Sequence, residues 1–397
     1  MDCLSEHERI CFNQVRNAVR DEIHPNYDTE FNILRYCQSC EFNASKTIYM
    51  LKKHLRFRAE YNLDEGERTL RGEAWLEEYA PWTILGPNRG HDADHVVVIE
   101  QGGQIDSHGL LKSVEITSYM HQRYRRMEKI YSIMQQLERE TGRQCYAYFI
   151  FDLNGLHFDP TLIPVMTGPF RNAWYEAGLH YRQWIDRVFV VNAPTFMSIL
   201  WSAMAPLISE DMKRRIVFTS GNGADELLAR IDSDRLPKMY GGQMNDDVVL
   251  PPKRIPKQMY WKLRSDYPNP KALIPLSIPA GKKRTLSFEV KEPCKLHFYL
   301  IAHHQITLSL TYTQDNINYD TTSVETIASE CTRVGLPSMD YFTHLLTSSG
   351  HYHLHLMNDA SWLLPITVKY LILSHNQYKP QNVIPVTASA AVSKTKK

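Results

Sequence analysis

The sequence predicts an α/β domain built on a mainly parallel sheet, followed by a small antiparallel β-sandwich. Between about residues 82 and 250, short apolar segments typical of buried strands alternate with helical patterns, which is typical of βαβ units. After about residue 250, short segments with a period of two are separated by turn residues, which indicates a sandwich. The two patterns meet at a proline-rich stretch that we interpret as a linker.

Composition narrows the class of protein. The chain has 397 residues, of which 43% are apolar and 22% charged, so it can bury a full core. Its formal net charge of +1 argues against a dedicated nucleic-acid binder. Seven scattered cysteines form no disulfide framework, and the charged start MDCLSEHERI does not resemble a signal peptide. We therefore expect a cytoplasmic protein.

The first elements along the chain are helices, over residues 5–61. Apolar residues recur there at helical spacing, and Asn43 is a plausible cap for the second of these helices. Cys37 and Cys40 form a CxxC within this pattern. A lone CxxC is a weak signal, so we favour two small helical residues over a metal or redox site.

Strands and helices then alternate. Buried strands are predicted at residues 95–100, 145–152, 188–191 and 215–219, and helices at residues 118–140 and 161–181. SGNGAD, over residues 220–225, follows a strand but lacks the lysine of a phosphate loop, so we interpret it as a strand-to-helix turn.

An unusually apolar helix follows the third of these strands. Residues 188–209 contain no charge and are long enough to cross a bilayer, but Asn192 and Pro194 interrupt them. We favour a strand followed by the helix TFMSILWSAMAPLI. That helix is apolar around most of its circumference, so it is either centrally buried or a movable gate over an apolar cavity.

Catalytic and metal signatures are weak. We find no nucleophile elbow, P-loop or dinucleotide fingerprint, and we predict no enzyme and no cofactor. Asp152 ends a strand and is interpreted as a turn-stabilising residue. His351, His353 and His355 share one face of a strand; a metal site is one interpretation, and a solvated face is the one we favour.

Five segments in the right order resemble the CRAL-TRIO lipid-binding family, in the subgroup with a C-terminal GOLD domain that includes supernatant protein factor, also called tocopherol-associated protein. They are FNILRYCQSCEFNASKTIYMLKKHLRFRAEYNL, FIFDLNGL, RVFVVNAPTFMSILWSAMAPLISEDMKRRI, LPKMYGGQM and GHYHLHLMNDASWLLPITVKYLIL. The resemblance implies a helical module (1–75), an α/β lipid-pocket domain (76–250) and a jelly-roll-like GOLD sandwich (251–376). We expect a disordered basic tail at 377–397.

The resemblance also implies a function and a site. It implies non-catalytic binding of a phospholipid or other hydrophobic molecule, either alone or with transfer between membranes, and transient membrane contact. The alternative is a lipid-sensing adaptor that binds a protein through the GOLD domain. Headgroup candidates are Arg215 and Gln183, because the family's other basic headgroup positions are lost here. The residues implied for the gate and pocket are Phe196, Ile199, Leu200, Met204, Leu207 and Ile208.

Overall fold

The structure is a computed structural model that describes residues 4–65, 74–159, 162–205, 208–314, 324–361, 363–376, 379–382 and 387–389. The chain forms two compact units. One contains residues 1–107 and 120–255 and is called the cavity unit below. The other contains residues 108–119 and 256–397 and is called the sandwich unit.

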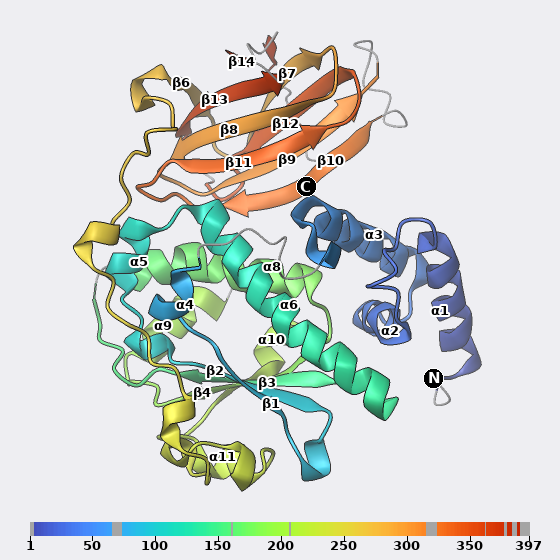
Figure 1. Ribbon diagram of the computed structural model, residues 1–397, viewed down its shortest axis with the longest axis vertical. Helices are drawn as coiled ribbons and strands as arrows, with labels where there is room; N and C mark the ends of the chain where they lie inside the picture. The colour runs from blue at the N-terminus through green and yellow to red at the C-terminus, as the bar shows by residue number, and fades with distance from the viewer. Residues whose placement is uncertain are drawn as a thin grey trace. The chain divides into compact units, whose positions relative to one another are not determined.

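The cavity unit is built on a five-stranded sheet of order β1-β2-β3-β4-β5, in which β1 is antiparallel to β2 and the other pairs are parallel (Figure 1). The strands are β1 (Thr83–Pro87), β2 (His95–Glu100), β3 (Tyr146–Asp152), β4 (Ile185–Val191) and β5 (Ile216–Phe218). The predicted parallel sheet is thus confirmed for β2 to β5. Sequence reasoning missed the edge strand β1.

The described part of the chain also contains helices. They are α1 (Glu6–Val19), α2 (Glu30–Ser39), α3 (Ala44–Tyr61), α4 (Leu76–Tyr79), α5 (Ser107–Ser113), α6 (Ile116–Thr141), α7 (Leu162–Val165), α8 (Arg171–His180), α9 (Met197–Met204), α10 (Glu210–Arg215) and α11 (Ala224–Leu228). One π-helical turn, Met166–Phe170, joins α7 to α8. The predicted helices over 118–140 and 161–181 correspond to α6 and to the α7–α8 segment.

A side-chain cap that the sequence predicted begins one of the N-terminal helices. The Asn43 side chain accepts a hydrogen bond from the Lys46 backbone N–H at 3.0 Å and caps α3, as predicted. Cys37 is buried in α2 and Cys40 follows as its C-terminal cap. Burial raises the pKa of the Cys37 thiol to about 12, so it is protonated at neutral pH. Cys37 thus lies within the helix, as expected, whereas Cys40 lies just beyond its end.

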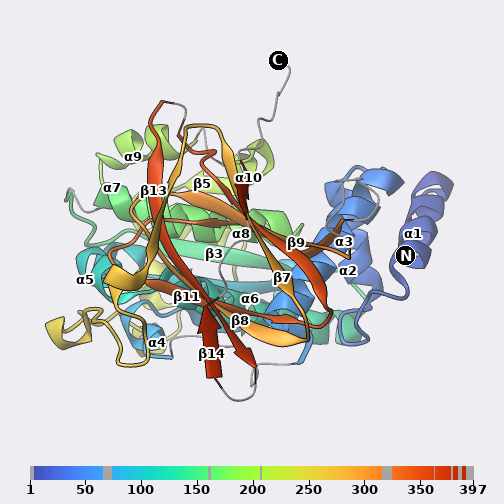
Figure 2. The same cartoon turned by 90° about the horizontal axis from the view of Figure 1, so that it is seen from above.

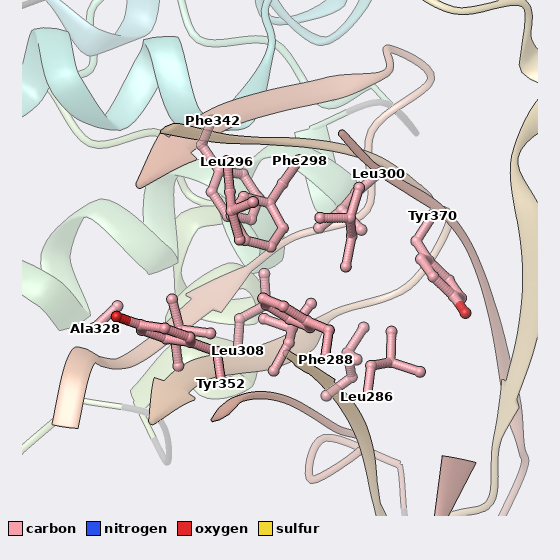
Figure 3. Close-up of a cluster of buried hydrophobic side chains, with 14 of the residues drawn as sticks. Leu286, Phe288, Leu296, Phe298, Leu300, Leu308, Ala328, Phe342, Tyr352 and Tyr370 are labelled. Atoms are coloured by element: carbon pink, nitrogen blue, oxygen red, sulfur yellow. The ribbon is translucent and has the colours of Figure 1, made fainter. Parts of the chain in front are cut away.

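The sandwich unit contains two antiparallel sheets, of order β10-β9-β12-β7-β15 and β11-β8-β13-β14, with β6 paired to β13. The strands are β6 (Ile274–Ile278), β7 (Lys283–Val290), β8 (Cys294–Ala302), β9 (Ile306–Thr313), β10 (Glu325–Arg333), β11 (Asp340–Leu346), β12 (Gly350–Met357), β13 (Ile366–Asn376), β14 (Lys379–Asn382) and β15 (Thr387–Ser389). Figure 3 shows Phe298 and Phe342 of one sheet facing Leu308 and Tyr352 of the other across the buried core.

The two faces of strand β12 were predicted to differ, one lying in the core and the other exposed to solvent. Tyr352 and Leu354 face the core, as predicted. The opposite face is not solvated at His353 and His355, which are 6% and 7% exposed. Each ring is held between two hydroxyl groups: Ser287 and Thr313 at 2.8 and 3.0 Å for His353, and Thr285 and Thr311 at 2.9 and 3.0 Å for His355. The prediction of a solvated histidine face was wrong because flanking strands supply hydroxyl partners that a single strand's pattern cannot reveal.

Other expectations concern the apolar helix. Helix α9 is shorter than the predicted 14-residue segment, and Pro206 and Leu207 lie outside the described residues. Among the described helices, none is both long and apolar enough to cross a membrane. Figure 2 gives a second view of α9 near α7 in the cavity unit.

Candidate functional site

An apolar cavity of about 410 Å³ lies in the cavity unit between the sheet and helices α8, α9 and α10. Its walls come from strands β3, β4 and β5 on one side and from these helices and the π-helical turn on the other. The lining residues are Phe151, Met166, Phe170, Arg171, Trp174, Tyr175, Gly178, Leu179, Arg182, Val188, Val190, Met197, Trp201, Ile208, Ser209, Met212, Ile216 and Phe218.

The local sequence pattern explains why these side chains converge. In β4, Val188 and Val190 alternate with Phe189 and Val191, so that the first pair faces the cavity and the second pair packs in the core on the other face. Helix α8 contributes residues at helical spacing, beginning with Arg171 and followed by Trp174, Tyr175, Gly178 and Leu179. The sequence contains this signal in the predicted 161–181 helix, but an amphipathic pattern alone does not distinguish a cavity lining from a packed core.

Helix α9 contributes fewer residues to the cavity lining than the sequence suggested. Met197 and Trp201 line the cavity, as does Ile208 beyond the helix. Leu200 is 4% exposed but is not part of the lining, whereas Ile199 is 65% exposed.

The other predicted gate residues lie elsewhere. The Phe196 ring contacts the ring of Phe158, with centroids 5.6 Å apart. The side chains of Met204 and Leu207 lie outside the described residues. Of the six side chains predicted for the gate and pocket, Ile208 is the described one that lines this cavity.

The cavity reaches the molecular surface. Tyr175 and Phe218 both line it and are 47% and 42% exposed. The ring of Phe218 meets the Trp201 ring edge-on, with centroids 5.2 Å apart, so α9 and β5 join at this opening. A hydrophobic molecule in the cavity would therefore be covered in part by aromatic side chains that also contact solvent.

Two arginines, Arg171 and Arg182, carry the positive charge of the cavity lining. The Arg182 Nε donates to the Leu179 carbonyl at 3.0 Å, which fixes the guanidinium just beyond the end of α8. Both residues were missed at the level of sequence, because a cation on an amphipathic helix is usually a solvated one.

The two predicted headgroup residues, Arg215 and Gln183, do not line this cavity; they bond to each other. The Arg215 guanidinium also donates to the Ile185 carbonyl at 2.5 Å and to the Asp211 carboxylate at 3.1 Å. With its side chain 15% exposed and three protein partners, Arg215 connects α10 to the start of β4.

Asp152, at the end of β3, joins three loops. Its carboxylate accepts hydrogen bonds of 2.8 Å from the Asn154 backbone, the Asn192 side chain and the Tyr240 hydroxyl. The prediction of a turn-stabilising aspartate is confirmed. The SGNGAD turn is confirmed as well, since Gly223 has a φ of +72° and precedes α11.

The described residues contain no group of three or more histidine, cysteine or acidic side chains that could hold a metal ion. The shape and lining of the cavity suit it to shield an apolar molecule from water and to place a cation beside a polar end.

Comparison with known proteins identifies the parts of the chain. Residues 83–242 match the CRAL/TRIO domain. Residues 259–381 match the F28H7_8_C:-like, C-terminal domain, and residues 4–66 match DUF8435, a domain of unknown function.

Two relatives span nearly the whole chain. The sequence is 42% identical over 377 residues to the CRAL-TRIO domain-containing protein F28H7.8 of Caenorhabditis elegans, covering 93% of this chain and 92% of the relative. It is 25% identical over 355 residues to Protein ctg-1 of the same organism, covering 86% and 90%. The crystal structure of Sfh5 is similar with a TM-score of 0.49 and 15% identity, over 66% of this chain and 93% of that one.

Proposed function

Because the chain belongs to the CRAL-TRIO family, whose members generally bind lipophilic ligands, we propose that it holds one hydrophobic molecule in the cavity beneath α9 and exchanges it at a membrane surface. The observation that carries this proposal is the apolar cavity of about 410 Å³, open at Tyr175 and Phe218. No step of the proposed function makes or breaks a covalent bond.

The energetics favour such a role. Exposure of a hydrocarbon chain to water costs about 0.8 kcal/mol for each CH₂ group, so even a short chain is held strongly by a dry cavity. The cavity volume lies toward the lower end of the range of about 300–1,000 Å³ that small-molecule pockets span. These quantities support a compact hydrophobic molecule or a single acyl chain as the part that is enclosed.

Helix α9 is the proposed gate. Ile199 is exposed on its outer side, while Met197 and Trp201 line the cavity on its inner side. A helix with apolar residues on both sides can leave the cavity and remain buried if its outer side enters a bilayer. Phe158, which is 56% exposed and contacts Phe196, extends this apolar surface.

We assign the polar end of the ligand to the arginines of the cavity lining. Arg182 is the stronger candidate, because its Nε is fixed on a backbone carbonyl while the guanidinium borders the cavity. A guanidinium suits a carboxylate or a phosphate, which it can bind with two parallel hydrogen bonds. Arg215 and Gln183, implied as headgroup residues by family resemblance, form their own hydrogen bond instead.

Native mass spectrometry of the recombinant protein, with extraction and identification of any lipid that copurifies, tests the proposal. We expect one lipid per chain, or its uptake after incubation with mixed-lipid vesicles. A protein that stays empty after that incubation would contradict the proposal and would favour a lipid-independent adaptor.

Gly178 offers a sharp variant for this test. Gly178 lines the cavity, and a Cβ atom built there meets no atom within 4 Å, so alanine fits at this position without a clash. Gly178→Trp should abolish retention of the lipid, whereas Gly178→Ala should preserve it and stabilise α8 by about 0.5–1 kcal/mol. Equal lipid occupancy in the two variants would show that the ligand lies elsewhere.

We propose further that the C-terminal sandwich is a GOLD-type domain and that the protein works in the cytoplasm with transient membrane contact. The two antiparallel sheets and the segment from Gly350 to Leu373 support the GOLD assignment. Cysteines that are buried and unpaired in this structure are compatible with a reducing compartment.

A further inference from the structure

The loop between β12 and β13 displays two consecutive leucines. Leu363 and Leu364 are 75% and 66% exposed, and Pro365, also exposed, follows them. We propose that this loop is a membrane-docking element of the sandwich unit, in which the two leucines enter the outer acyl region of an anionic bilayer. The proposal goes beyond ligand binding in the cavity and does not depend on it.

Hydrogen bonds hold this loop in a defined shape. The Ser361 hydroxyl donates to the Leu364 carbonyl at 2.8 Å and accepts from the Leu364 backbone N–H at 3.1 Å. The buried Asn358 side chain donates to the same carbonyl and to the Ile278 carbonyl, both at 3.1 Å. These bonds hold the backbone of Leu364 against Asn358 and Ser361, while the side chains of Leu363 and Leu364 are exposed.

A basic turn lies against the loop. The Gly281 backbone N–H donates to the carbonyls of Asn358 and Ser361 at 2.8 and 3.0 Å, and the Asn358 N–H donates to the Lys282 carbonyl at 3.0 Å. This turn continues into Lys282-Lys283-Arg284, three consecutive cations. The loop itself carries one acidic residue, Asp359, whose carboxylate accepts from the Thr307 hydroxyl at 2.8 Å.

The exposed leucines and the neighbouring basic turn favour an anionic bilayer as the binding partner of this loop. Exposed leucines gain free energy when they leave water, and lysines beside them gain from the negative surface potential of acidic lipids. A hydrophobic tip next to a basic turn satisfies both conditions at the depth where acyl chains meet headgroups.

Vesicle co-sedimentation of the full chain tests the proposal, with phosphatidylcholine vesicles made with and without phosphatidylserine. We expect binding that requires phosphatidylserine and weakens with salt. Leu363→Ser combined with Leu364→Ser should weaken it at least about tenfold. Lys282→Gln and Lys283→Gln should each weaken it about fivefold.

Leu345 provides the matched control. Leu345 is 69% exposed on β11, where it pairs with Lys295 of β8. The docking loop leads into β13, whose first residue paired to β8 lies opposite Ala302. Lys295 and Ala302 lie about 20 Å apart along β8, at about 3.3 Å per residue, so Leu345 is far from the docking loop. Leu345→Ser should leave vesicle binding unchanged.

Three outcomes would overturn the proposal. They are an equal loss of binding in the Leu345→Ser variant, no loss in the double leucine variant, and concentration-dependent dimers in size-exclusion chromatography that the double leucine variant abolishes. The last would show that a second copy covers the loop. Thermal unfolding of each variant verifies folding, and lipid occupancy by native mass spectrometry separates failure of docking from failure of the cavity.

Discussion

Arg215 donates a hydrogen bond from its Nη2 to the Gln183 side-chain oxygen at 2.7 Å, across 32 positions of sequence. Gln183 has a φ of +52°, so it lies in the left-handed region just before β4. The arginine thus fixes a tight turn, and its further bond to the Ile185 carbonyl extends this role. Arg215, which family resemblance suggests for a lipid headgroup, therefore also fixes a turn of the fold.

Replacing this arginine should therefore affect stability more than ligand binding. We expect Arg215→Ala to lower the free energy of unfolding by about 1–3 kcal/mol, because it leaves the partly buried acceptors Ile185 O and Gln183 Oε1 without a charged donor. Arg182→Gln should instead lower the affinity for an anionic ligand by about tenfold, since it removes one charge-assisted contact. It should change the free energy of unfolding little. Urea unfolding and ligand titration of both variants measure the two effects.

The Arg182 experiment has an internal control in the charge of the ligand. A neutral analogue with the same apolar part should bind the wild type and Arg182→Gln equally. A loss of affinity for both analogues would mean that Arg182 shapes the cavity instead of contacting a charged headgroup.

The sequence could predict the scaffold of this site but not its cations. Strand β4 and helix α9 were visible as a run without charged residues, because burial imposes composition. Whether Arg182 or Arg215 borders the cavity depends on how the chain turns between α8 and β4. That turn depends on contacts such as the one between Arg215 and Gln183. A contact between residues so far apart in sequence leaves no signal in the local hydrophobic pattern.

The Asp152 carboxylate should be a major stabilising group of the cavity unit. It is 1% exposed and bonds Asn154, Asn192 and Tyr240. Asp152→Ala should cost about 3 kcal/mol, because it leaves several buried donors unpaired, and Tyr240→Phe should cost about 1 kcal/mol. Chemical unfolding followed by tryptophan fluorescence provides the measurement.

Tyr175→Phe is the matched control for Tyr240→Phe, because Tyr175 is 47% exposed. We expect no change in unfolding free energy there. If Tyr240→Phe were as neutral as the control, the 2.8 Å bond to Asp152 would not contribute to stability. Sequence alone identified Asp152 as a turn residue but could not join it to Tyr240, which lies 88 positions away.

A buried ion pair joins helix α2 of the N-terminal helical module to helix α6. Arg35 bonds Glu138 and the Cys145 carbonyl, and the two charged side chains are 1% and 3% exposed. Glu138→Gln should destabilise the protein by about 3–5 kcal/mol, because the arginine keeps its charge in an apolar environment without a counter-charge. Guanidinium unfolding measures the loss.

The exposed pair between Arg16 and Asp28 is the control, with a separation of 3.6 Å and side chains 42% and 35% exposed. Asp28→Asn should cost about 0–1 kcal/mol, since water screens such pairs. Similar losses in Glu138→Gln and Asp28→Asn would contradict the role assigned to burial.

His355 should make the sandwich sensitive to acid. Burial lowers its pKa from 6.5 to about 4, with smaller contributions from Lys283 and His353, and burial also lowers the pKa of His353. Between these two pH values the unfolded chain binds a proton at His355 that the folded chain does not bind. The stability contributed by neutral His355 is therefore complete above pH 6.5 and is lost as the pH falls toward about 4, by about 3 kcal/mol at most.

The replacement His355→Asn should flatten this dependence, because an amide does not titrate and can still bond Thr285 or Thr311. The measurement is the midpoint of urea unfolding at several pH values between 4 and 7. His351→Asn on the same strand serves as the control, since His351 is more exposed than its two neighbours. A wild-type slope that persists in His355→Asn would assign the acid sensitivity to other histidines, such as the half-buried His344, whose pKa is also lowered to about 4 by desolvation.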